Sequence, residues 1–191
     1  MSLGAAQLGV PVDTWLSAPA GFLEVVEVVD GVLVIKKVGG NPHHIIARRL
    51  ADEFERQWDV VATAPGNWAV EMAPDGSVVR GRIPDVLVNG PELFTEDVHV
   101  GVPVAAVEVW SPSNMLREMN EKRAEYRNAG LPVLLEAFLS DSGDVHLDWM
   151  VNLRSHWSTV AASEGDTILD VPALSGVHEA FAVVPNTLLR R

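Results

Sequence analysis

The chain has 191 residues, a formal net charge of −12, 48% hydrophobic residues and no cysteine. This length and hydrophobic content suit one well-cored globular domain and exclude a disordered chain. The lack of cysteine excludes disulfides and thiolate metal ligands, and the acidic charge argues against non-specific polyanion binding through a broad basic surface.

The N-terminal segment lacks the features of a signal peptide. "MSLGAAQLGVPVDTW" carries no basic residues, and no stretch of the chain approaches the ~18 apolar residues that span a bilayer. We therefore expect a cytoplasmic protein that does not enter a membrane. Residues 1–20 are interpreted as an N-terminal arm, and residues 21–191 as a single domain.

The next two elements are a hairpin and a helix. In "FLEVVEVVDGVLVIKK", two β-branched runs meet at Asp30-Gly31, which is a strong hairpin signal. The helix "NPHHIIARRLADEFERQW" is predicted to begin with Asn41 as its N-cap. His43 falls on the face of this helix that carries the predicted buried stripe. That stripe consists of Ile46, Leu50 and Phe54.

Strands and a second helix follow. Residues 60–88 are predicted to form strands broken by turns, and the apolar runs at 83–88, 102–110 and 133–138 predict a central sheet covered on both faces. The helix "SPSNMLREMNEKRAEYRNAGLP" has Ser113 or Asn114 as its N-cap and ends at Gly130. Two more strands and a turn-rich tail complete one mixed α/β (α+β) domain, a central mixed sheet flanked by helices.

Two of the apolar strands each contain one carboxylate. Asp85 interrupts "RIPDVLV", and Glu108 interrupts "VPVAAVEVW". If the strands are sheet neighbours, the two carboxylates approach each other, and a shared Mg²⁺ would relieve their repulsion. The alternative for each is a strand-end carboxylate that faces water or caps a backbone amide.

A lysine lies on the inward stripe of the second helix. Met115, Met119 and Tyr126 define this stripe by their helical spacing, and Lys122 falls on it. Such a lysine either extends its ammonium to the edge of the core or meets a buried anion. Because the helix follows the Glu108 strand directly, Lys122 could reach both carboxylates. An Asp, a Glu and a Lys around a divalent metal suit phosphodiester hydrolysis.

Several segments together resemble a known family. They occur in one order across residues ~22–140, and the ordered set is more specific than any single segment. The segments are "EVVDG", "PHHIIARRL", "PD" at Pro84-Asp85, "EVWSPS", "EKRAEY" and "AGLP". In this respect the chain resembles the Uma-type family of putative restriction endonucleases, within the PD-(D/E)XK nuclease superfamily.

The resemblance implies a restriction-endonuclease-like fold and hydrolysis of nucleic acid, expected to be DNA, with Mg²⁺ or Mn²⁺. It makes Asp85 and Glu108 the metal ligands and Lys122 the catalytic partner. Glu27 and His43 match accessory positions, although Glu27 could instead be an exposed strand residue and His43 a histidine satisfied at the helix start. It also implies a homodimer, with the N-terminal arm a candidate for exchange.

The chain departs from the superfamily motif at two places. The slot two residues after the second acid, where the motif has lysine, holds Trp110. In Uma-type proteins this slot is generally apolar and a helical lysine is thought to substitute, a role that falls to Lys122. After Pro132, Leu135 and Phe138 occupy slots where the family tends to have Trp and Asp, and Glu136 is a further acid in this strand.

Three functions compete at this point. A metal-dependent endonuclease accounts for the complete set of Asp, Glu and Lys. A catalytically inactive nuclease fold that binds a partner would account for the acidic charge. A module that grips a cationic small molecule or peptide would also use two carboxylates. For a nuclease of this charge, Arg80 and Arg82 are the predicted local basic rim.

Overall fold

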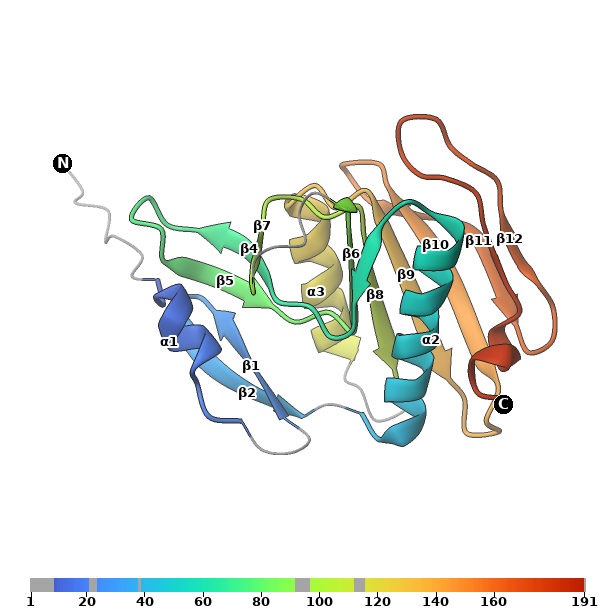
Figure 1. The fold of residues 1–191 in the computed structure, drawn as a ribbon, viewed down its shortest axis with the longest axis horizontal. Coiled ribbons are helices and arrows are strands. Elements are labelled where there is room, and N and C mark those ends of the chain that lie inside the picture. Colours follow the sequence, from blue (N-terminus) through green and yellow to red (C-terminus); the bar gives the residue numbers. More distant parts are fainter. Residues whose placement is uncertain (1–8, 21–23, 38, 92–96, 112–115, 191) are drawn as a thin grey trace.

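The computed structural model describes residues 9–20, 24–37, 39–91, 97–111 and 116–190, and most strands lie in two sheets (Figure 1). Sheet A contains, in spatial order, β2 (Val32–Lys37), β1 (Glu24–Val29), β5 (Val78–Arg82), β4 (Trp68–Met72) and β7 (His99–Val100). Sheet B contains β11 (Trp157–Glu164), β10 (Val145–Asn152), β9 (Val133–Leu139), β8 (Ala105–Trp110), β6 (Val86–Asn89) and β3 (Val61–Thr63). A small sheet pairs β12 (Leu169–Val171) with β13 (Phe181–Val183).

The predicted hairpin is confirmed as β1 and β2. Asp30 and Gly31 join the strands with φ of 51° and 75°, the left-handed values that a two-residue hairpin turn needs. The preceding segment carries helix α1 (Val12–Leu16), whose Trp15 is buried against sheet A. Part of the predicted arm therefore packs on the outer face of this hairpin.

Sheet B is covered on both faces, as predicted. Helix α2 (Asn41–Gln57) crosses one face (Figure 1) and buries its apolar stripe in the largest core cluster. That stripe contains the predicted Ile46, Leu50 and Phe54. Asn41 is not the N-cap, because Gly40 holds that position with extended backbone and Asn41 is already helical.

The opposite face of sheet B is covered by helix α3 (Leu116–Asn128), which connects the parallel strands β8 and β9. Its buried residues are Lys122 and Tyr126, so the predicted inward direction of these two side chains is confirmed, and Met119 is half-buried. The helix ends at Asn128 and the chain turns away at Gly130, which has a φ of 87°, while the Leu131 amide donates back to the Tyr126 carbonyl. The predicted caps Ser113 and Asn114, together with Met115, lie outside the described residues.

The stretch "RIPDVLV" differs from its prediction as one strand. Arg82 ends β5 in sheet A, whereas Val86 begins β6 in sheet B, so residues 83–85 carry the chain from one sheet to the other. Pro84 has no amide hydrogen for a strand ladder, which favours a break here. Asp85 therefore lies at the junction of the two sheets.

The mixed α/β class is confirmed, with sheet B as the central sheet and sheet A added beside it. In the part of the chain that the structure describes, helices that are both long and apolar enough to cross a membrane are absent.

Candidate active site

Asp85 and Glu108 lie side by side at one end of sheet B. Strands β6 and β8 are antiparallel, and Val86 pairs with Val107. Asp85 precedes the first residue of this pair and Glu108 follows the second, so the two acids are brought to adjacent positions. The adjacency inferred for the two strands is confirmed.

The carboxylate of Glu108 is buried and fully engaged. The Lys122 Nζ donates to both of its oxygens, at 3.0 Å to Oε1 and 2.9 Å to Oε2. The Tyr126 hydroxyl donates to Oε1 at 2.6 Å. Lys122 is 8% exposed, so its ammonium meets a buried anion and does not extend to the edge of the core.

Asp85 is held by the backbone and by a histidine. Its Oδ2 accepts the Val109 amide at 2.7 Å, and its Oδ1 lies 2.7 Å from the His43 Nε2. His43 comes from the first turn of α2, where it lines the same cleft as Asp85. The α2 helix therefore brings His43 to the paired acids, although His43 lies 42 positions before Asp85 in the chain.

Glu27 approaches the acids from sheet A. It is 1% exposed, its Oε2 accepts from the Arg82 Nη1 at 2.7 Å, and its Oε1 lies 3.5 Å from the Lys122 Nζ. The sequence could not distinguish this position from that of an exposed strand residue. In the structure Glu27 is buried and faces α3.

The predicted basic rim is wrong for both arginines. Arg82 is 3% exposed and donates to Glu27 and, through two hydrogen bonds of 2.6 and 2.7 Å, to Glu125 of α3. Arg80 forms ion pairs with Asp30, Glu71 and Glu125. Both guanidinium groups are neutralised by carboxylates of the same chain, so neither offers a free cation to a phosphate.

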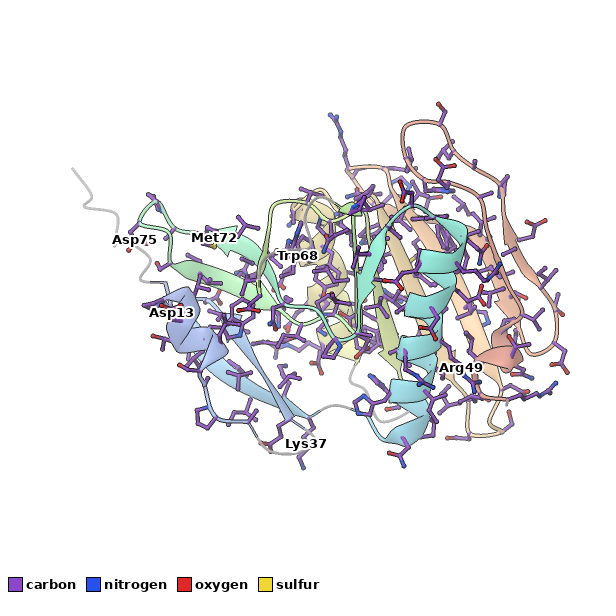
Figure 2. The ribbon with its side chains drawn as sticks, in the orientation of Figure 1. Asp13, Lys37, Arg49, Trp68, Met72 and Asp75 are labelled. Atoms are coloured by element: carbon purple, nitrogen blue, oxygen red, sulfur yellow. The ribbon has the colours of Figure 1, made fainter. Side chains whose placement is uncertain are left out.

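A cleft of about 520 Å³ opens over these groups. Its polar lining comes from both sheets, α2 and α3, and consists of Glu27, Lys36, Lys37, His43, Asp85, Glu108, Ser111, Glu118 and Lys122. Lys37 ends β2 at the point where the chain passes on toward α2 (Figure 2). Lys36 pairs with Glu118 of α3 at 3.0 Å across this cleft. Lys36 is thus paired with a carboxylate like the arginines of β5, and Lys37 is the lysine of β2 that adds positive charge to this lining.

Comparison with known proteins identifies the family. The family model of Uma2, described as "Putative restriction endonuclease", matches residues 21–183. The chain belongs to the Uma2 family. A crystal structure of a putative nuclease belonging to DUF820, from Anabaena variabilis ATCC 29413, has a TM-score of 0.60 and 13% identity, covering 94% of this chain and 97% of that one. At this identity the likeness shows a shared fold. A search of curated proteins found no match.

Trp110 in this Uma2 protein lies beside the lysine that the sequence suggested as a substitute. The Lys122 Nζ is 5.7 Å from the centroid of the Trp110 ring, within the range of a cation–π contact. The Trp110 side chain, two residues after Glu108, thus packs its apolar ring beside the ammonium. Glu136 pairs with Glu108 in the β8–β9 register, but its carboxylate is bound by Arg123 and does not join the cleft lining.

Burial and neighbouring charges shift the pKa values in this Uma2 site. Burial, together with the nearby charge of Asp85, raises the pKa of Glu108 to about 7 against the opposing effects of Lys122 and of the Tyr126 hydrogen bond. Burial also acts to lower the pKa of Lys122, but Glu108, Glu27 and Asp85 together raise it above its ordinary value. For Glu27, Lys122 and Arg82 outweigh burial and lower the pKa. Glu108 is therefore the acid whose ionised form has most to gain from another cation.

The donor set fits a hard divalent cation. The described residues contain no group of three or more His, Cys, Asp or Glu side chains arranged as a metal site. Mg²⁺, however, commonly binds one or two carboxylates and keeps several waters. Asp85 and Glu108 provide two such carboxylates at the wall of a cleft that can hold water and a phosphate. Both carboxylates now accept protein hydrogen bonds, so metal binding requires some of these bonds to be exchanged.

Two residues that bind the buried acids of this site, Tyr126 and Arg82, are not among the site residues predicted from the sequence. Tyr126 was recognised as an inward residue, and its position four residues after Lys122 would place its hydroxyl near the same anion. Arg82 carried no comparable signal, because its partners lie 55 and 43 positions away in the chain.

Proposed function

We propose that this protein is a metal-dependent endonuclease that hydrolyses phosphodiester bonds in nucleic acid, with DNA as the expected substrate. The observation that carries the proposal is a buried Lys122 ammonium bound to Glu108, with Asp85 beside it at the wall of a cleft. Membership of the Uma2 family supports the same class of reaction.

In this mechanism Asp85 and Glu108 would hold Mg²⁺ or Mn²⁺. The bound metal supplies Lewis-acid activation of the phosphate and of a water nucleophile. Lys122 places a positive charge where negative charge develops on the phosphate oxygens during attack. His43 fixes one oxygen of Asp85, and the Tyr126 hydroxyl orients Glu108. Lys37 would attract the sugar–phosphate strand to the cleft.

The test of the metal site is a thermal melt with and without millimolar Mn²⁺. A ligand that binds only the native state stabilises it by about 2.7 kcal/mol at a hundredfold excess over its Kd. We expect Mn²⁺ to raise the Tm of the wild type and to leave that of the double variant Asp85→Asn/Glu108→Gln unchanged. Equal Mn²⁺-induced shifts in the two proteins would contradict the proposed ligands.

Affinity for DNA should be weak when no metal is present. The net charge is −12, and the described arginines nearest Asp85 are neutralised by carboxylates, so few free cations remain to release counterions from DNA. We expect labelled duplex DNA to bind measurably tighter in Ca²⁺ than in EDTA, as judged by fluorescence anisotropy. Tight binding in EDTA that survives moderate salt would be incompatible with this electrostatic account.

The homodimer implied by the resemblance and the cytoplasmic location are also part of the proposal. Sedimentation velocity of the purified protein measures the first directly. A single species at the monomer mass, across micromolar concentrations, would remove the dimer from the proposal.

A further inference from the structure

The ammonium of Lys122 is placed between two carboxylates that belong to different sheets. It lies 2.9 and 3.0 Å from the oxygens of Glu108 in sheet B and 3.5 Å from the Oε1 of Glu27 in sheet A. The side chain is 10% exposed, so water cannot easily replace either partner. The lysine is thus bound mainly to Glu108 and lies within a short movement of Glu27.

Metal binding at Glu108 would disturb this arrangement. Lys122 donates to both oxygens of Glu108, which are the same atoms that a divalent cation would use. An ammonium and a divalent ion on one buried carboxylate repel each other strongly, because little water screens them. Lys122 and the metal therefore compete for Glu108, and the ammonium needs another anion once the metal is bound.

Glu27 is placed to bind the ammonium in place of Glu108. Arg82 binds its Oε2 at 2.7 Å, and among the residues that the structure describes Oε1 has, besides Lys122, a long contact of 3.4 Å from the Ile83 amide. Arg82 is itself fixed by two hydrogen bonds to Glu125. Glu27 is therefore a buried carboxylate with a fixed orientation and one oxygen facing the lysine.

We propose that Glu27 is a positioning residue that takes over the ammonium of Lys122 when Glu108 binds the metal. This transfer removes the lysine as a competitor at Glu108 and keeps it charged beside the scissile phosphate. The inference rests on the metal site of the proposed function, and it assigns to Glu27 no contact with the metal.

A double-mutant cycle read by Mn²⁺ calorimetry tests this role. The proteins are the wild type, Glu27→Gln, Lys122→Met and the combined variant. With Lys122 present, Glu27→Gln should weaken Mn²⁺ binding about tenfold, a coupling typical of residues in contact, because the lysine then stays on Glu108. With Lys122 replaced by Met, the same change should alter the Kd by less than about threefold, because the competitor is gone.

Glu125→Gln is the matched control. It removes one carboxylate from the same Arg82 network without touching Lys122, so its Mn²⁺ Kd should stay within about threefold of the wild type. Glu27→Asp keeps the charge and should retain most of the affinity. Thermal melts verify folding. If Glu27→Gln does not fold, the shorter Glu27→Asp replaces it in the cycle, and its smaller loss of Mn²⁺ affinity should again disappear in the Lys122→Met background.

Three results would overturn the inference. An equal loss of Mn²⁺ affinity from Glu27→Gln in both backgrounds would make Glu27 a direct metal ligand. An unchanged Kd in both would leave it a purely structural residue. Wild-type protein that binds no Mn²⁺ would remove the metal site and this role together. Calorimetry reads binding alone, so the nuclease proposal is tested separately by cleavage.

Discussion

Replacing Lys122 by Met should lower metal-dependent cleavage of plasmid or single-stranded DNA by about a hundredfold or more, the usual effect of removing one group that stabilises transition-state charge. Methionine keeps the apolar stem of the lysine, so the packing beside Trp110 and Tyr126 changes little. Asp85 and Glu108 remain in place, and the Mn²⁺-induced rise in Tm should therefore persist. Loss of cutting with retained metal binding is the expected signature.

The metal-free Lys122→Met protein should also melt at a lower temperature, because Glu108 is 2% exposed and loses its cation. Mn²⁺ should recover much of this loss. Arg117→Met is a suitable control, since Arg117 lies on the same helix with its side chain 84% exposed. A Lys122→Met protein that cuts as well as the wild type would remove the lysine from the site. Wild-type protein that cuts no substrate with any metal would favour the inactive binding protein.

The features that the sequence predicted correctly are those that local patterns encode. The Asp30-Gly31 turn determines the hairpin, because only a few residue types accept left-handed backbone at two successive positions. The spacing of Lys122 and Tyr126 determines which side of α3 faces inward. Asp85 and Glu108 could be recognised as site candidates because burying an unpaired charge in an apolar strand costs much free energy.

The features that the sequence could not supply depend on pairing between distant segments. The break after Arg82 places β5 and β6 in different sheets. The local sequence does not indicate which strands will pair with each of them. Arg80 and Arg82 look like a basic rim until their carboxylate partners are known, and those partners come from other elements. The pairing of Glu136 with Arg123 spans 13 positions, but it too depends on how α3 packs against β9.

Replacing Arg82 by Met should give the largest loss of stability among single changes near the site. Arg82 is 3% exposed and binds Glu27, which is 1% exposed, so its removal leaves a buried carboxylate without its fixed partner. Breaking a buried ion pair in this way typically lowers the free energy of unfolding by about 3–5 kcal/mol. Urea denaturation of the metal-free protein at neutral pH measures the difference.

Two further variants separate the ion pair from general packing. Arg56→Met removes an exposed arginine whose partner is Glu53, and it should leave the free energy of unfolding nearly unchanged. Adding Glu27→Gln to Arg82→Met should recover part of the stability, because the orphaned charge is then absent. If Arg82→Met unfolds with the same urea midpoint as the wild type, the Glu27–Arg82 pair does not hold sheet A against α3, and another contact must fix Glu27 beside Lys122.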